Sequence, residues 1–391
     1  SQHISDLRSL PLTPLKSEPT MTPDQDINVY RTAFASLKGI NPVLAREFLQ
    51  RTGSEQNFFS ATERQLSAVM GFSNRIFDDR YRGELLEKAR RETGFISASG
   101  IRALYFTDAD YPQRLNDVED APLMLYALGS ADLNRGLMVS VVGTRHATPY
   151  GLDFVGHLVA DLKEKCAENV TVISGLAFGI DAAAHCAALK QGLPTVGVLA
   201  HGLNMIYPSQ HRAMAAEMVR NEGLLITEYR SDAPVHKGNF IARNRIVASL
   251  CDALVVAESA RKGGALITAR LASGYNRDVF ALPGRTSDRY SQGCNRLIAC
   301  HTAALIQNAD DLIDAMGWPR RKNGPEQPTL FRELSPEEQT VMECLTSRGE
   351  AHLTTLTMAL GAPVSKVMGL LIDMEFKGLV TAYPGGNYRL A

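Results

Sequence analysis

The sequence predicts an α/β fold built on a parallel sheet. Short β-branched runs alternate with amphipathic or Ala-rich helices between 95 and 316, a pattern typical of a parallel sheet covered on both faces. Two of the strands, 139–142 and 170–173, break at glycine and lead directly into helices. Because the carboxyl ends of parallel strands meet at one edge of the sheet, we expect the loops that follow them to share one ligand crevice.

The same alternation places the individual elements of this region. Core strands are expected near 139–142, 170–173, 195–199, 223–227, 253–257 and 278–281. Helices are expected near 150–166, 179–190, 209–221, 239–250, 264–275 and 292–300.

A helical domain is predicted before the sheet, over 27–94, where apolar residues recur with a period near 3.6. Its segment 37–54 has the helix–glycine turn–helix form in which backbone N–H groups can meet a DNA phosphate, although Asn41 stands where a second glycine would allow close approach. A small helical domain that only packs on its neighbour fits equally well. Residues 1–26, with four prolines among Ser and Thr, are expected to form a disordered leader.

A third domain is predicted at the carboxyl end. Residues 317–334, rich in Pro, Gly and charge, are expected to be a linker between 95–316 and 335–391. Three helical stretches and a hairpin turning at Gly385-Gly386 then predict a winged helix. Its acidic balance, five Lys and Arg against seven Asp and Glu over 332–391, favours protein contact over duplex DNA binding.

Composition excludes several classes of protein. The six cysteines form no CxxC pair, which argues against structural zinc and for free thiols in a reducing cytosol. The sequence has no apolar run long enough for a transmembrane helix and no signal-peptide pattern, so we expect a cytoplasmic protein without membrane contact. Residues 201–300 hold thirteen Lys and Arg against eight Asp and Glu, which is compatible with a groove for a polyanion.

The loop after 139–142 predicts a phosphate site. It places Gly143, Thr144 and Arg145 where a strand passes into a helix, and backbone N–H groups at such junctions face anions. The neighbouring loop begins with Ser174 and Gly175. Neither loop is GxGxxG and no GxxxxGK[ST] occurs, so an ordinary dinucleotide or ATP site is disfavoured.

Two further segments add cations. The stretch 236–246 carries Lys237, Arg243 and Arg245 without an acidic residue, and Phe240 follows Lys237 by one helical turn. Cations for phosphates beside an aromatic ring for a base favour single-stranded nucleic acid. In the alternative interpretation Phe240 is core and one arginine pairs with Glu228 or Glu258. Lys262, Gly263 and Gly264 open another helix after a strand.

Catalytic and metal sites are not indicated. Asp181 and His185 stand at i and i+4, but no third ligand has a fitting spacing. Ser174 does not lie in a GxSxG sequence, and we expect its hydroxyl to bind phosphate or to cap a helix. We therefore expect no metal, no cofactor and no catalytic residue.

Seven motifs in a fixed order resemble the DNA-processing protein A family, also called DprA or Smf. They are GTRHATPYG, SGLAFGIDAAAH, GLNMIYP, FIARNRI, GGALITAR, VFALPG and GCNRLI. The resemblance implies an extended Rossmann-like core that forms homodimers, with a helical domain (SAM-like or helix-hairpin-helix-like) before it and a winged helix after it. It also implies a protein that binds and shields single-stranded DNA during natural transformation and recombination, and loads a RecA-type recombinase on it.

The resemblance also assigns roles to residues. Gly143, Thr144 and Arg145 resemble the loop that holds DNA phosphates, and Ser174 and Gly175 its neighbour. Lys237 resembles a backbone contact and Phe240 the residue that stacks on a base. The remaining residues are similar to the basic rim and the last wall of the pocket: Arg243, Asn244, Arg245, Lys262, Gly263 and Gly264. Ile241 departs from the family pattern, which often has proline there.

Three rival functions fit the sequence less well. A nucleotide hydrolase on a related fold would need a carboxylate on the helix that GGALITAR begins, where this chain has Arg270, so only Asp181 and Glu258 remain for it. A sequence-specific regulator conflicts with the acidic winged helix, and a pure recombinase adaptor conflicts with the basic segments. The sequence thus predicts a non-catalytic single-stranded DNA-binding protein.

Overall fold

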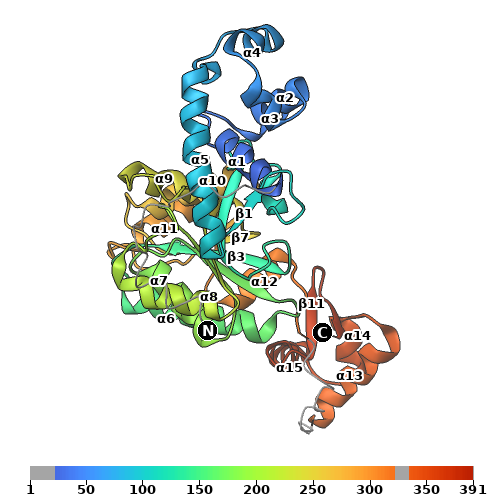
Figure 1. Cartoon of the computed structure of the whole chain (residues 1–391). Coiled ribbons are helices and arrows are strands. Elements are labelled where there is room, and N and C mark those ends of the chain that lie inside the picture. Colours follow the sequence, from blue (N-terminus) through green and yellow to red (C-terminus); the bar gives the residue numbers. More distant parts are fainter. Residues whose placement is uncertain (1–22, 322–333, 391) are drawn as a thin grey trace. The chain divides into compact units, whose positions relative to one another are not determined.

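The computed structural model describes residues 23–321 and 334–390, which belong to two compact units divided between 321 and 322 (Figure 1). The expected leader lies outside the described residues up to position 22, and the first helix begins at Pro23. Most of the expected linker also lies outside them, while its first residues, 317–321, pack on the first unit through Trp318 and Arg320.

The first unit opens with a helical domain. Its elements are α1 (Pro23–Ala35), α2 (Pro42–Thr52), α3 (Glu55–Ser60), α4 (Glu63–Met70), a 3-10 turn (Arg75–Phe77) and α5 (Asp79–Ser99). Aromatic rings fill its centre, where Phe58 lies 5.3 Å from Phe34 and 5.8 Å from Phe48, centroid to centroid. Between α1 and α2, Gly39 adopts a φ of +78° and the Asn41 side chain accepts from the Leu44 N–H at 2.8 Å. Asn41 is therefore the N-cap of α2.

Nine strands form the central sheet. They are β1 (Arg102–Tyr105), β2 (Met124–Gly129), β3 (Leu137–Gly143), β4 (Val170–Ser174), β5 (Thr195–Val198), β6 (Leu224–Thr227), β7 (Ala253–Glu258), β8 (Asp278–Ala281) and β9 (Ala304–Leu305), in the spatial order β1-β2-β6-β5-β4-β3-β7-β8-β9. The six predicted strands are present, and all pairings from β6 to β9 are parallel. The pairs β1–β2 and β2–β6 are antiparallel, and strands β1, β2 and β9 were not predicted from the sequence.

Helices cover both faces of this sheet. They are α6 (Pro149–Lys165), α7 (Ile180–Lys190), α8 (Arg212–Arg220), α9 (Lys237–Ser249), α10 (Gly264–Gly274), α11 (Gln292–Ala299) and α12 (Ala309–Met316). Val139 and Val141 of β3 pack into the core that contains α6, α7 and α12, whereas Met138 and Val142 pack into the core that contains α9 and α10. Successive side chains of a strand point to opposite faces, so this division confirms the doubly covered parallel sheet.

The chain reverses direction across the sheet next to β3. From β3 it proceeds through β4 and β5 to β6, and it then returns to place β7 on the other side of β3. Helix α6, which follows β3, and helix α10, which follows β7, lie on opposite faces. A crevice opens at the strand carboxyl ends where such a reversal occurs, and it is the usual ligand site of open α/β sheets.

The helical domain is fastened to the loop between β6 and α9. The carboxylate of Glu92, on α5, accepts the backbone N–H of Ser231 at 3.0 Å and also its hydroxyl. The Arg230 guanidinium donates to the Ser36 hydroxyl at 2.7 Å. The core of the helical domain is also continuous with that of the adjacent sheet face, so the two regions form one compact unit.

The second unit is a winged helix, as predicted. Its elements are α13 (Pro336–Arg348), β10 (Ala351–His352), α14 (Leu353–Leu360), α15 (Val364–Phe376), β11 (Val380–Tyr383) and β12 (Asn387–Leu390), with the sheet order β10-β12-β11. Ser335 and Glu338 form a capping box at the start of α13. Gly385 and Gly386 turn the hairpin with φ values of +87° and +78°, a region that glycine enters without steric cost.

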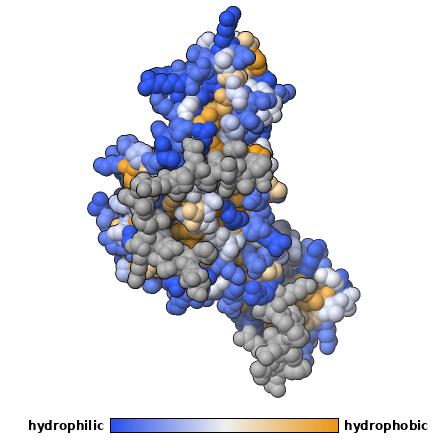
Figure 2. Space-filling view, in the orientation of Figure 1, coloured by the Kyte–Doolittle hydropathy of each residue, from blue (hydrophilic) through white to orange (hydrophobic). Residues whose placement is uncertain are grey.

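The described surface is mostly hydrophilic on the face that Figure 2 presents, with scattered hydrophobic residues. Among the described helices, no single one is long and apolar enough to cross a membrane. The adjacent pair α14 and α15, bent by 107°, passes the same test of length and composition when taken together.

Candidate nucleic-acid interface

A pocket of about 370 Å³ opens at the carboxyl ends of β3, β4 and β7, beside α9. Most of the predicted site residues line it: Gly143, Thr144, Arg145, Gly175, Phe240, Arg243, Asn244, Lys262, Gly263 and Gly264. Ser174, Lys237 and Arg245 do not. The pocket lies where the chain reverses direction across the sheet, as expected for an α/β ligand site.

The loop after β3 is held rigidly and presents Arg145 at its tip. The Thr144 N–H donates to the Glu258 carbonyl at 2.8 Å, and the Thr148 N–H donates to the buried Glu258 carboxylate at 2.9 Å. Gly179 adopts a φ of +77°, and a Cβ there would lie 2.2 Å from the Thr144 carbonyl, so the loops after β3 and β4 pack backbone against backbone. Arg145 itself is exposed.

The loop after β4 offers fewer donors than predicted. The Ser174 hydroxyl is buried and donates to the Val141 carbonyl at 2.6 Å, so it neither reaches the pocket nor caps α7. The N–H groups of Gly175 and Ala177 point at the Asp181 carboxylate, at 3.2 and 3.4 Å. This loop therefore shapes the pocket, while two of its N–H groups are already directed at Asp181.

Arg243 is a buried structural cation and does not form part of an exposed rim. It is 5% exposed, and one guanidinium nitrogen donates to the carbonyls of Gly175, at 2.6 Å, and Val198. Burial lowers the pKa of Arg243, and the charge of Asp181 opposes that shift. A Cβ at Gly175 would lie 2.6 Å from the same guanidinium, so glycine is required where Arg243 packs.

Asp181 and His185 each have structural partners. Burial raises the pKa of Asp181, and Arg243 and the loop N–H groups oppose that shift. The Thr195 hydroxyl donates to the Val172 carbonyl at 2.8 Å, so His185 Nδ1 is the donor in its 2.7 Å contact with Thr195. Among the described residues, His185 Nε2 has no partner, and no group of three or more His, Cys, Asp or Glu is placed to hold a metal ion.

Helix α9 brings an aromatic ring to the pocket. Phe240 is half-buried, and its ring lies 5.6 Å from that of Tyr207 at 67°. Asn244 lines the same wall one turn further on. Lys237 is exposed at the first position of the helix, one turn before Phe240 and outside the pocket lining.

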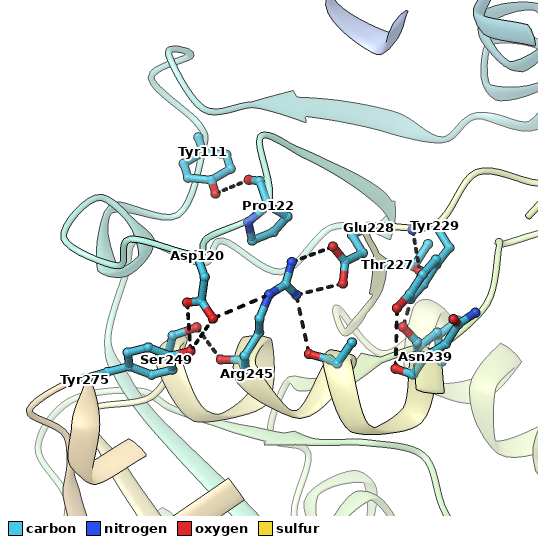
Figure 3. Close-up of polar contacts among 12 residues, drawn as sticks. Tyr111, Asp120, Pro122, Thr227, Glu228, Tyr229, Asn239, Arg245, Ser249 and Tyr275 are labelled. Carbon is cyan, nitrogen blue, oxygen red and sulfur yellow. Dashed lines mark hydrogen bonds and ion pairs between the residues drawn. The ribbon is translucent and has the colours of Figure 1, made fainter. Parts of the chain in front are cut away.

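Arg245 lies away from the pocket, on another side of α9. Its guanidinium donates to both carboxylate oxygens of Glu228, at 2.7 and 2.6 Å, and lies 4.0 Å from Asp120 (Figure 3). The Tyr275 hydroxyl donates to the same Asp120 at 2.8 Å. The alternative pairing with Glu228 is therefore the one observed, and the assignment of Arg245 to a basic rim is not supported by its position.

The amino end of α10 forms another wall of the pocket. Gly263, which has no side chain to cap the helix, and Gly264 line the pocket beside the exposed Lys262. A Cβ at Gly263 would lie 2.5 Å from the Ser259 hydroxyl, so a larger residue would disturb this turn. The unpaired N–H groups and the dipole of a helix amino end favour an anion here.

The lining residues that the sequence did not predict include His146, Arg289 and Tyr290. The Tyr290 carbonyl accepts the Ser259 N–H at 2.6 Å, which brings the loop after β8 beside the loop after β7. The ring of Tyr290 lies 6.3 Å from that of His146 at 27°, and the Arg289 guanidinium lies 5.6 Å from the Tyr290 centroid. The spacing of DRYSQG gave no local signal, because a contact between distant loops creates this wall.

Comparison with known proteins defines the class. Residues 102–317 match the sequence model of the DNA recombination-mediator protein A family, and 325–386 match that of the DprA winged helix domain. The chain is 32% identical to the Smf protein of Synechocystis over 92% of this chain and 98% of that protein. It therefore belongs to the DprA/Smf family of DNA-processing proteins.

A solved structure of the same family agrees with this assignment. The Streptococcus pneumoniae DNA processing protein A is 29% identical and superposes with a TM-score of 0.62, covering 76% of this chain and 98% of that one. The Helicobacter pylori protein, which binds single-stranded DNA, is 30% identical with a TM-score of 0.49, covering 55% and 95%.

Proposed function

We propose that this protein binds single-stranded DNA with the strand's phosphates in the pocket between β3, β7 and α9. One observation supports this most directly. Arg145, Lys262 and Arg289 line the pocket as exposed cations, and within the described residues none of the three is ion-paired. Unpaired cations around a helix amino end attract a chain of phosphates.

Aromatic rings on two sides of these cations favour a single strand over a duplex. Phe240 with Tyr207 lies on the α9 side, and Tyr290 with His146 on the side of the loop after β8. Bases are free to stack on such rings only when they are unpaired, and each stacked base contributes about 1–3 kcal/mol.

The pocket chemistry supports binding better than hydrolysis. Of the described residues that line it, Asp181 is the only acid, and its carboxylate already accepts two loop N–H groups. Glu258 is bonded to the N–H and hydroxyl of Thr148. A nucleotide hydrolase needs a carboxylate free to move a proton to or from the reacting group. We infer that the protein is not an enzyme and uses no cofactor.

Membership of the DprA/Smf family supports a wider role for this protein. We infer that the protein shields DNA taken up during transformation, loads a RecA-type recombinase on it, and forms a homodimer through the α/β core. The winged helix suits a protein contact, because Lys366 of α15 and Lys377 directly after it are paired with acids of α13. Lys366 pairs with Glu337 and Lys377 with Glu338, each at 2.6 Å. These lysines are therefore partly neutralised as phosphate ligands.

Fluorescence anisotropy tests the proposed site. A labelled dT oligonucleotide and a matched duplex are titrated with the whole protein, with Arg145→Glu and with Arg220→Glu as the matched control. Arg220 is exposed at the carboxyl end of α8, at the opposite edge of the sheet. We expect preference for the single strand, and loss of binding in Arg145→Glu alone. Equal loss in both variants, or preference for the duplex, would overturn the proposal and direct attention to hydrolysis of nucleoside monophosphates.

A further inference from the structure

We propose that the bound strand continues from the pocket, past Tyr290, into a second basic groove formed by the loop after β7 and helix α11. This inference rests on the proposed function and assigns the path of the strand beyond the pocket. The groove has a volume of about 320 Å³ and is lined by Arg261, Thr286, Gln292, Asn295 and Arg296.

The groove and the pocket are adjoining parts of one surface. Arg261 of the groove precedes Lys262 of the pocket, and Tyr290 of the pocket precedes Gln292 of the groove by two residues. Two chain segments thus pass from one cavity to the other, and a strand that leaves the pocket beside Tyr290 meets Arg261 next.

Backbone hydrogen bonds fix these two segments to each other. The Ser259 N–H donates to the Tyr290 carbonyl at 2.6 Å, and the Gly293 N–H donates to the Ser259 carbonyl at 2.8 Å. A Cβ at Gly293 would lie 2.6 Å from the carbonyls of Ser259 and Ala260, so only glycine allows this approach. The cations of the groove are therefore carried on a rigid base, as a binding surface requires.

The charge of the groove is positive and uncompensated. Arg261 and Arg296 are exposed, and in the part of the chain that the structure describes neither is ion-paired. Arg285 and Arg289 lie in the adjoining loop, and Asp288 is the one acid in the sequence from 284 to 296. Guanidinium groups pair with phosphate through two parallel hydrogen bonds, so this surface suits a phosphodiester backbone.

The two amide side chains that line the groove, Asn295 and Gln292, have different roles. Asn295 both donates to the Gly284 carbonyl at 2.8 Å and accepts the Gly284 N–H at 3.1 Å, so it holds the Pro-Gly turn after β8. Gln292 and Arg296 lie one turn apart on α11, on the same face. Gln292 is exposed there and adds a neutral donor beside the two arginines.

Oligonucleotide length separates the groove from the pocket. The double variant Arg261→Ala/Arg296→Ala is titrated by anisotropy with a short dT oligonucleotide of about four nucleotides and a long one of about fifteen, lengths that bracket typical sites for single strands. On the long oligonucleotide we expect the slope of log K against log salt to become shallower by about 1.4, since each phosphate contact contributes about 0.7. If the double variant and the unaltered protein bind equally at 1 M salt, the double variant should bind about 25-fold more weakly at 0.1 M salt.

The short oligonucleotide should bind the double variant and the unaltered protein alike. The double variant Lys190→Ala/Arg220→Ala, which removes two cations from the far ends of α7 and α8, controls for net charge. Equal loss of affinity for both oligonucleotides, or a loss no greater than in the control variant, would overturn the proposal that the strand enters the groove. Failure of the unaltered protein to bind either oligonucleotide would instead overturn the proposed function, so the two failures are distinguishable.

Discussion

Replacing Arg145 by alanine gives the sharpest test of how the pocket holds DNA. Three exposed cations line the pocket: Arg145, Lys262 and Arg289. If each neutralises one phosphate of a single strand, the slope of log K against log salt for a short oligonucleotide is about −2.1, from about 0.7 per contact. The affinity then falls roughly 18-fold between 50 and 200 mM salt.

The Arg145→Ala variant should retain two of these contacts. We expect its slope to be about −1.4 and its affinity at 0.1 M salt to be about fivefold lower than that of the unaltered protein, with the two lines converging toward 1 M. Arg145 is exposed at the tip of a loop that backbone bonds and Glu258 hold, so its removal should leave the fold intact.

The measurement is a salt series of anisotropy titrations with a short labelled dT oligonucleotide, which excludes contributions from the groove beyond Tyr290. Arg220→Ala serves as the control and should reproduce the unaltered slope. Parallel lines for Arg145→Ala and the unaltered protein would refute the reasoning, because affinity would then be lost without loss of a counterion-releasing contact.

Substitutions at three further positions test stacking in the pocket and the buried groups beside it. Phe240→Ala should weaken dT binding by about 1–3 kcal/mol if one base stacks on this ring, whereas Phe240→Tyr should bind as the unaltered protein does. Equal anisotropy curves for Phe240→Ala and the unaltered protein would show that no base stacks on Phe240. Arg243→Gln should lower the free energy of unfolding in urea by about 1–3 kcal/mol, because the buried carbonyls of Gly175 and Val198 lose their guanidinium donor, and an unchanged urea midpoint would show that these bonds do not stabilise the fold. Burial lowers the pKa of His185 from its ordinary value of 6.5 to about 3. Below pH 6.5 the unfolded chain therefore takes up a proton at His185, whereas the folded protein does not. Stability should therefore fall as the pH falls, by about 2 kcal/mol from pH 7 to pH 5, and urea titrations of His185→Asn should lack this loss; identical pH dependence in both proteins would contradict the assignment.

The sheet was predictable where strands are short apolar runs that alternate with helices. All six strands from β3 to β8 carry that signal, because parallel strands buried on both faces are nearly continuous apolar runs. Strands β1 and β2 lie in a segment whose apolar residues serve an antiparallel edge beside the helical domain, and β9 has only two residues. Such short or edge strands leave too weak a pattern to be recognised without their partners.

The candidate site divides in the same way. Loops that directly follow strands, such as those with Arg145 and Lys262, were placed by topology alone. On α9, helical spacing explains which residues were correctly assigned to the pocket and which were not. Phe240, Asn244 and Val247 recur at i, i+4 and i+7 and line the pocket. Arg245 falls on another side, where Glu228 meets it. Tyr290 required a contact between loops more than 30 residues apart in the chain, which no local pattern encodes.

The bond between Glu92 and Ser231 has a consequence for how the molecule can be divided. The loop that Ser231 belongs to leads directly into α9, so α5 supports the segment that presents Phe240 to the pocket. A shortened chain that begins after α5 would lose the Glu92 carboxylate, which accepts the Ser231 N–H, and the Ser36 hydroxyl, which accepts from Arg230. It would also lose part of a shared hydrophobic core. The amino-terminal helices are thus better regarded as a foundation of the α/β unit than as a detachable module, and their removal would alter the pocket from a distance.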